Sequence, residues 1–189
     1  MKTDKELADF SNEHLAYEIQ TLWHATSILN SLARQPIDHW FTTAIRNVYL
    51  DSFAIHARVL HDFLFSLRPI DDDIVALHYV ENWASICPPK TPLLNTLPTK
   101  ANKQVAHLTY KRIEYEQSGK GWDFTGVFFE ILGLLLIFRA NARPSSLGQN
   151  IVNLLDLLSA KQIQLFNIKP IFSGSRQTGV IIEMLRHST

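Results

Sequence analysis

The chain has 189 residues, and its 18 basic residues are balanced by 18 acidic ones, which gives a formal net charge of zero. Hydrophobic residues make up 46% of the chain and charged residues 19%, a composition typical of a folded globular protein and not of a long disordered segment. The neutral balance excludes a global positive field that would attract nucleic acid from a distance, so any anion site must be a local cluster.

Length and cysteine content both point to one soluble domain. A chain of this length is expected to form a single domain, here taken as residues 1–189. The one cysteine, Cys87, cannot form an internal disulfide, so nothing indicates an oxidising compartment. The first ten residues lack the apolar core of a signal peptide. The apolar run 124–138 contains Glu130 and is shorter than the roughly 20 residues of a membrane span, which favours a buried core helix. We therefore expect a cytoplasmic protein without membrane association.

The first two expected helices cover about 4–32 and about 39–67, separated by a break at Arg34-Gln35-Pro36. The second has the clearer pattern, with two apolar stripes at helical spacing. One stripe comprises Phe41, Ile45, Val48, Ile55, Val59 and Phe63, and the other Tyr49, Phe53, Leu60 and Leu64. Because two stripes give a wide apolar face, this helix is expected to be central.

The rest of the chain also predicts helices joined by short breaks. Three aspartates, 71–73, suit the start of a short helix ending near Trp83, and the proline-containing stretch 87–92 predicts an extended surface loop. Further helices are expected at about 99–116, 122–143 and 151–165. The predicted fold is all-α, a helical bundle with an appended C-terminal segment that is helical or irregular.

The helix expected at 99–116 carries the most informative surface. At 100° per residue, Ala101, Val105 and Leu108 fall on one side and form a buried stripe. The opposite side carries Lys100, Lys103, His107, Tyr110 and Glu114. An imidazole can transfer protons, lysines can hold a phosphate, and a tyrosine can stack or donate a hydrogen bond. The same pattern is also what any solvated helix face shows, and this reading stays open.

The segment Asn102-Lys103-Gln104-Val105-Ala106-His107-Leu108-Thr109 resembles a branch of the HEPN superfamily. The helix 46–58, followed by Asp62-Phe63-Leu64, resembles the segment that precedes the motif helix in members associated with abortive infection. The resemblance covers about residues 40–140, with a HEPN-like core at about 38–143. It implies a helical-bundle protein of a bacterial defence or toxin–antitoxin system. Many such proteins are metal-independent ribonucleases that dimerise, so that two Arg–x(4–6)–His motifs face one cleft.

Carried onto this chain, the resemblance assigns His107 as the acid–base residue. The arginine of the motif is not present: the allowed spacings place it at Asn102, Ala101 or Lys100, and of these only Lys100 is cationic. Lysine cannot reproduce the two-pronged guanidinium contact with phosphate. The implied catalytic residues are His107, Lys100 and Asn102. The implied RNA contacts are Lys103, Tyr110 and Lys111, and no cofactor is implied. A literal match, Arg34 to His39, contains Pro36, which breaks the helix that the motif requires.

Metal chemistry and phosphate loops are weaker interpretations. The chain lacks the paired Glu-x-x-His motifs of a di-iron bundle, and it lacks HExxH. His56 and His61 lie about 140° apart on a helix, so polar packing or ion pairing with Arg58 and Asp62 is expected for them. A three-helix metal site formed by His24, His56 and His78 remains an alternative. The segment 174–179 lacks Walker spacing and predicts a turn.

A non-enzymatic interaction protein is the alternative function. The same helix face would then be a dimer or partner surface, as in a degenerate HEPN member that regulates a protein encoded by a neighbouring gene. The neutral net charge and the missing arginine both favour this alternative.

Overall fold

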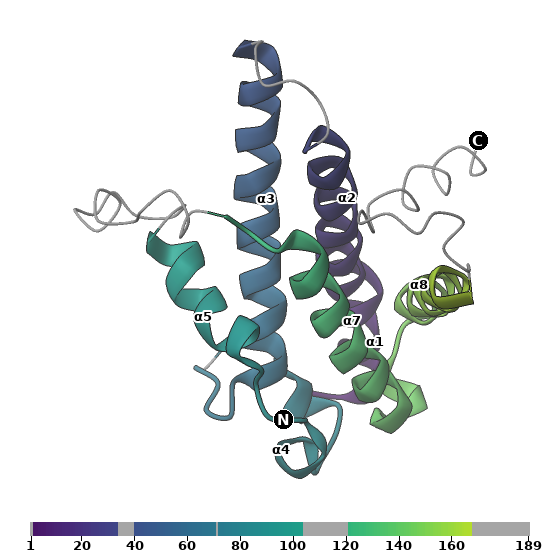
Figure 1. Cartoon of the computed structure of the whole chain (residues 1–189). Helices are drawn as coiled ribbons and strands as arrows, with labels where there is room; N and C mark the ends of the chain where they lie inside the picture. Colours follow the sequence, from purple (N-terminus) through teal and green to yellow (C-terminus); the bar gives the residue numbers. More distant parts are fainter. Residues whose placement is uncertain (1, 34–39, 71, 104–120, 168–189) are drawn as a thin grey trace.

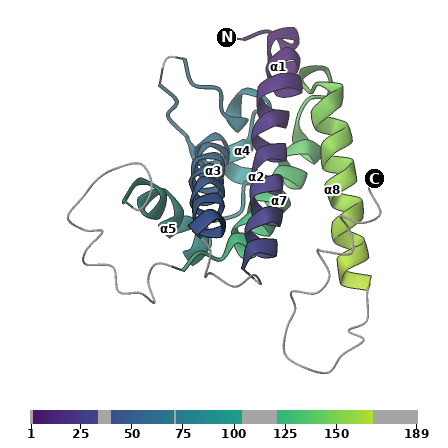
Figure 2. The ribbon, with the colours of Figure 1, turned by 90° about the horizontal axis from the view of Figure 1, so that it is seen from above.

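The computed structural model of the protein describes residues 2–33, 40–70, 72–103 and 121–167, with side chains up to residue 160. Every element within these ranges is helical, which confirms the expected all-α bundle for this part of the chain. Both views of the ribbon place α5 and α8 on opposite sides of a central pair formed by α2 and α3 (Figure 1, Figure 2).

The N-terminal helix runs through α1 (Asp4–Phe10), a π-helical turn (Ser11–Leu15) and α2 (Ala16–Leu32), as expected for about 4–32. Thr3 caps its start: the Thr3 hydroxyl accepts from the backbone N–H of Glu6 at 3.2 Å, and the Glu6 carboxylate accepts from the backbone N–H of Thr3 at 2.7 Å. The π-helical turn lies where the chain entering α8 packs against it, since the Ser11 hydroxyl accepts from the Gly148 N–H at 2.9 Å.

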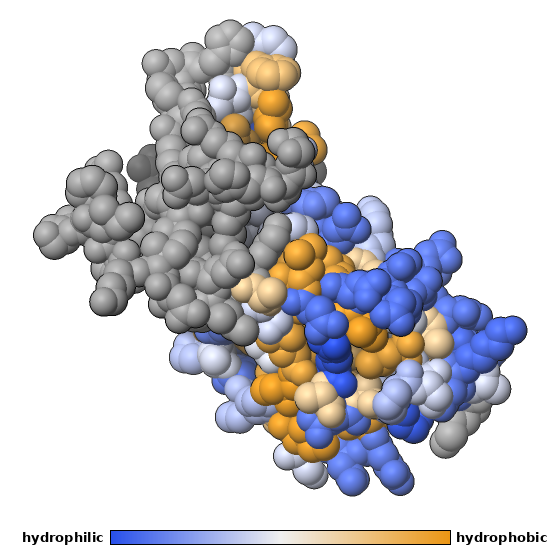
Figure 3. Space-filling model, turned by 90° about the vertical axis from the view of Figure 1, so that its right-hand side faces the viewer, coloured by the Kyte–Doolittle hydropathy of each residue, from blue (hydrophilic) through white to orange (hydrophobic). Residues whose placement is uncertain are grey.

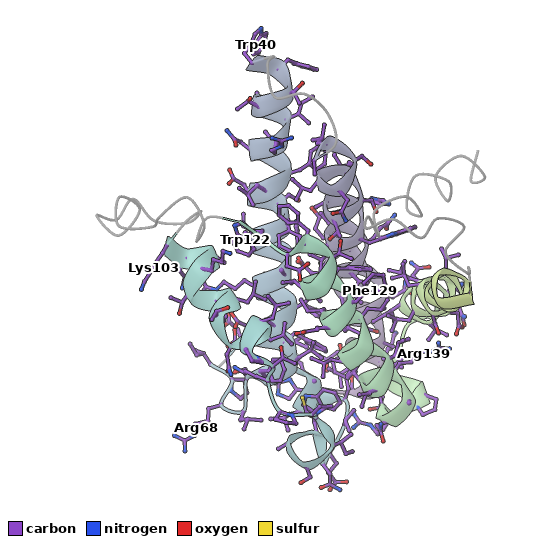
Figure 4. All side chains as sticks on the ribbon, in the orientation of Figure 1. Trp40, Arg68, Lys103, Trp122, Phe129 and Arg139 are labelled. Atoms are coloured by element: carbon purple, nitrogen blue, oxygen red, sulfur yellow. The ribbon has the colours of Figure 1, made fainter. Side chains whose placement is uncertain are left out.

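Helix α3 (Trp40–Phe65) confirms the expected second helix within two residues at each end. It packs most extensively against α2 and also contacts α5 and α7, which fits the expected central position. Its first turns extend beyond the other helices, with Trp40 at the tip (Figure 1, Figure 4). The two apolar stripes have different surroundings. The stripe with Phe53, Leu60 and Leu64 is buried, whereas much of the other stripe remains exposed.

The prediction of one short helix that ends near Trp83 was wrong. The structure has a short 3-10 helix (Ala76–His78) and the four-residue α4 (Trp83–Ile86) instead. The physical reason is the burial of Tyr79 and Trp83, which are both 0% exposed. The Tyr79 hydroxyl donates to the Leu7 carbonyl at 3.1 Å, and the Trp83 indole N–H donates to the Leu64 carbonyl at 2.6 Å. These two anchors hold the chain against the core in short turns. Burial also raises the pKa of Tyr79.

The last expected helices are confirmed as α7 (Phe124–Asn141) and α8 (Gln149–Asn167), separated by a 3-10 turn (Pro144–Ser146). By length and composition α7 is the one helix in the described ranges that could cross a membrane. In this structure α7 packs against α2, α3, α5 and α8.

The helices enclose one cluster of buried side chains that extends from Leu7 to Leu158. Phe138 of α7 stands edge-on to three aromatic rings, those of Phe63, Tyr79 and Trp83, at centroid distances of 5.2, 5.3 and 6.0 Å. Such edge-to-face contacts are favoured by the ring quadrupoles. The N-terminal helix and α8 therefore share their core with the 38–143 region.

Candidate functional site

The helix that carries the first candidate residues, α5 (Pro92–Ala101), begins seven residues before the expected start at residue 99. Thr91 caps it, with its hydroxyl accepting from the Leu94 N–H at 3.2 Å, and Pro92 occupies the first helical position. Proline is well suited to that position because its missing N–H would have no partner there. The expected loop 87–92 is thus shorter by one residue, and Pro98 lies inside the helix.

The inner face of α5 is formed by Leu94, Leu97 and Ala101, which are buried in a helix that contacts α3 and α7. The backbone stays helical at Asn102, whose N–H points to the carbonyls of Pro98 and Thr99. Lys100, Asn102 and Lys103 are half-buried at the end of this helix. Figure 4 shows Lys103 pointing away from the bundle there.

Lys100 contacts the chain that leads into α7. Its ammonium group donates to the Gly121 carbonyl and lies 4.8 Å from the centre of the Trp122 ring. Trp122 in turn stands edge-on to the buried ring of Phe53 at 5.6 Å. Burial lowers the pKa of Lys100. Lys100 therefore has a packing role in addition to the charge that the sequence predicted.

Asn102 is hydrogen-bonded to an arginine that was not among the site residues predicted from the sequence. The Asn102 side-chain oxygen accepts a hydrogen bond from the guanidinium of Arg58, which lies on α3 and is 44 residues away in the chain. The Arg58 side chain is 40% exposed, so a ligand can reach it. The guanidinium of Arg58, from another helix, therefore lies beside the Asn102 side chain.

Arg58 is also held by Asp62, one turn along α3, with 3.5 Å between Nε and Oδ2. Asp62 is shared with His61, whose Nδ1 lies 3.0 Å from the other carboxylate oxygen. Burial acts to raise the pKa of Asp62, but the hydrogen bond with His61 and the charge of Arg58 together lower it overall. The expected ion pairing is confirmed for His61, which contacts Asp62, whereas His56 pairs with Glu18 instead of Arg58 or Asp62. We call Arg58, Asp62, Lys100, Asn102 and Lys103 the α3–α5 cluster.

Asp62 also lines a cavity of about 540 Å³, which lies between the N-terminal helix and the end of α3. Its charged and polar lining includes His14, Glu18, His61, Asp62, Asp73 and Lys90. His61 is 3% exposed, and its Nε2 atom has no hydrogen-bond partner in the described structure. Because a carboxylate only accepts hydrogen bonds, the contact with Asp62 places a proton on Nδ1.

The metal site suggested by His24, His56 and His78 is not formed. Within the described ranges no three His, Cys, Asp or Glu side chains are grouped closely enough to hold a metal ion. His56 instead pairs with Glu18 at 2.6 Å, and His78 accepts from the Val75 N–H at 3.3 Å. Both histidines are therefore used in packing between or within elements.

Several sequence predictions lie outside the described residues. These are His107, Tyr110 and Lys111 of the candidate site, the motif match 34–39, and the turn 174–179. Their roles stay predictions. Comparisons with models of protein families, with curated proteins and with solved structures find no match for this chain.

The chemistry available at the α3–α5 cluster is recognition of an anion. A guanidinium offers a planar pair of donors that fits a phosphate, and lysines add flexible point charges. Lys103 is adjacent to Asn102 and three residues from Lys100, so its position on the helix lies between the other two. Of its three cations, Arg58 is bonded to Asn102 and Asp62, and Lys100 is directed to the Gly121 carbonyl and the Trp122 ring.

Proposed function

We propose that this chain is an RNA-binding protein that contacts phosphates through the α3–α5 cluster, with Arg58 and Lys103 as the principal contacts. The observation that carries the proposal is the hydrogen bond between Arg58 and Asn102. It supplies a guanidinium at a position where the HEPN-like pattern calls for arginine and this sequence has none. Lys100 acts mainly by fixing α5 to the chain before α7.

Metal-independent cleavage is the catalytic form of the same proposal. His107 would serve as the acid–base residue and Tyr110 and Lys111 as further RNA contacts, all as the resemblance to HEPN proteins implies. The resemblance also supports a role in a bacterial defence or toxin–antitoxin system. In such a cleavage an imidazole takes the proton of the 2′-hydroxyl, whose oxygen attacks the neighbouring phosphate; the 5′-oxygen leaves with a proton, and a cation stabilises the charge on the phosphate.

The test is binding of a labelled single-stranded RNA by wild type, Arg58→Lys and Lys103→Ala, followed by fluorescence anisotropy. Arg58→Lys keeps the charge but loses the two-pronged contact, so affinity should fall by about tenfold or more. Lys103→Ala should weaken binding several-fold. Lys5→Ala, an exposed lysine on α1, is the matched control and should bind as wild type does. Absence of RNA binding by the wild type would overturn the proposal.

Cleavage is measured on the same RNA in EDTA. An active wild type and an inactive His107→Ala variant that still binds RNA support the catalytic form. Binding without cleavage by the wild type supports the binding form alone. Cleavage that persists in His107→Ala refutes the role of His107.

A second candidate function is a non-catalytic protein that binds a partner. The observation that favours it is the apolar face of α3, where Val48 is 65% exposed and Ile55 is 51% exposed. A protein that binds no RNA but associates through this face would fit this alternative.

A further inference from the structure

The cavity between the N-terminal helix and the end of α3 is lined by a histidine whose hydrogen bonding is incomplete. His61 is 3% exposed, and its Nδ1 lies 3.0 Å from the Asp62 carboxylate. With the proton on Nδ1, the Nε2 atom of the neutral imidazole is a hydrogen-bond acceptor. Among the described residues none donates to Nε2, and the atom is shielded from water. A buried acceptor without a donor is unfavourable, and a bound molecule that donates to Nε2 would satisfy it.

The carboxylates that line the cavity are already used by other groups of the protein. Glu18 pairs with His56 at 2.6 Å, and Asp73 accepts from the Ile70 N–H at 3.0 Å. Asp62 is held by its two neighbours on α3, as described above. Because each carboxylate has a partner, the lining does not call for a cationic ligand.

Lys90 and Arg68 also line the cavity, but their placement does not favour an anion. The ammonium group of Lys90 lies over the Phe65 ring, 4.8 Å from its centre. Arg68 is exposed, and Figure 4 shows its side chain pointing away from the bundle. With three carboxylates against this lysine and arginine, the lining has no excess of positive charge. An uncharged ligand is therefore the one that fits.

Half of the lining residues are apolar, and they come from both sides of the cavity. Phe10 of the N-terminal helix lies against the His14 ring at 5.1 Å, and Phe65 of α3 lies against the His61 ring at 5.0 Å. Both phenylalanines are half-buried. Such rings pack well against a flat aromatic molecule. A volume of about 540 Å³ with apolar walls and a single open polar group is typical of a small-molecule site.

We propose that this cavity binds a small, uncharged aromatic molecule whose O–H or N–H group donates a hydrogen bond to Nε2 of His61. Asp62 holds the imidazole in the tautomer that this bond requires. Neither Arg58 nor Lys103 belongs to the lining, so the site is separate from the proposed RNA contacts and does not depend on them.

Two ligands of the same shape test the hydrogen bond in the wild-type protein. Indole has a ring N–H, and benzofuran has an oxygen atom in its place. Each is titrated at pH 8 into the ¹⁵N-labelled full chain, and amide chemical shifts give the affinity. Indole should bind about fivefold or more tightly than benzofuran, because benzofuran leaves Nε2 without a donor. Absence of indole binding, or equal affinity for the two ligands, would overturn the proposal.

A variant shows whether His61 is the acceptor. It is needed because apolar side chains are exposed elsewhere, as at the first part of α3 at the top of the molecule in Figure 3. His61→Phe keeps a ring but removes Nε2, so it should bind both ligands with equal affinity. His24→Phe, which changes an exposed histidine on α2, is the matched control and should keep the wild-type preference.

A preference for indole that persists in His61→Phe, or that is lost in His24→Phe, would also overturn the proposal. Far-UV circular dichroism checks that both variants fold. The comparison of indole with benzofuran in the wild type needs no variant, so it decides the proposal even if His61→Phe does not fold.

Discussion

Asp62 connects three side chains with different roles. Its two carboxylate oxygens contact His61 at 3.0 Å and Arg58 at 3.5 Å, and Arg58 reaches Asn102 of α5. Neutralising Asp62 would release both neighbours on α3. The position of the Arg58 guanidinium at the proposed RNA site therefore depends on the charge of a residue that would not itself contact RNA.

The sign of the pKa shift at Asp62 gives a pH-dependent prediction. Because its pKa is lower in the folded state, ionised Asp62 stabilises the fold above the unfolded pKa of about 4. That contribution is lost as the pH falls through the folded pKa. In Asp62→Asn, the free energy of unfolding measured with urea should therefore differ less between pH 7 and pH 3 than in wild type. The effect should be modest, since this side chain is 53% exposed.

The control for this prediction is Asp9→Asn, which changes an exposed carboxyl on α1. It should preserve the wild-type difference between the two pH values. Equal behaviour of the two variants would contradict a stabilising role for ionised Asp62.

Arg58 also shows what sequence spacing can and cannot reveal about single residues. The pairing with Asp62 was predictable because residues four apart on a helix are neighbours. The hydrogen bond to Asn102 could not be predicted, because Arg58 and Asn102 are 44 residues apart in the chain. Their contact depends on how α3 and α5 pack. The same limit applies to Lys100, whose contact with the Gly121 carbonyl is set by tertiary packing.

Replacing glycine with alanine is expected to have opposite effects on stability at Gly133 and Gly148. Gly133 lies inside α7 with no atom within 4 Å of the place a Cβ would take, so Gly133→Ala should raise the free energy of unfolding by about 0.5–1 kcal/mol. At Gly148, before α8, a Cβ would lie 2.3 Å from Asn12 Cβ and 2.7 Å from the Ala8 carbonyl. Gly148→Ala should lower the free energy of unfolding by about 1–3 kcal/mol. Urea denaturation measures both, and a stabilising Gly148→Ala would refute the close packing of α8 on the π-helical turn.

At the scale of elements, the long helices were predictable because their apolar spacing repeats over many turns, as in α3 and α7. The π-helical turn was not, since one extra residue in a helical turn leaves little trace in that spacing. The start of α5 was placed too late because prolines normally interrupt helices. Here Pro92 occupies the first position, and the helix continues through Pro98.

At the scale of the molecule, the sequence could not decide which stripe of α3 faces the core. Both stripes are apolar and both repeat with helical spacing, so periodicity alone supports either orientation. Packing against α2, α5 and α7 decides it by burying Phe53, Leu60 and Leu64. The consequence is an exposed apolar face on the same helix as Arg58.

Charge distribution over the whole molecule limits how RNA binding can respond to salt. With zero net charge, attraction to RNA must come from a local group of cations. In the proposal these are the two or three cations of the α3–α5 cluster and Lys111. For single-stranded RNA, each neutralised phosphate contributes about −0.7 to the slope of log K against log salt concentration. Two to four phosphate contacts should give the wild type a slope of about −1.4 to −2.8, and Lys103→Ala should reduce its magnitude by about 0.7. A slope steeper than about −2.8 would mean that further cations bind the RNA.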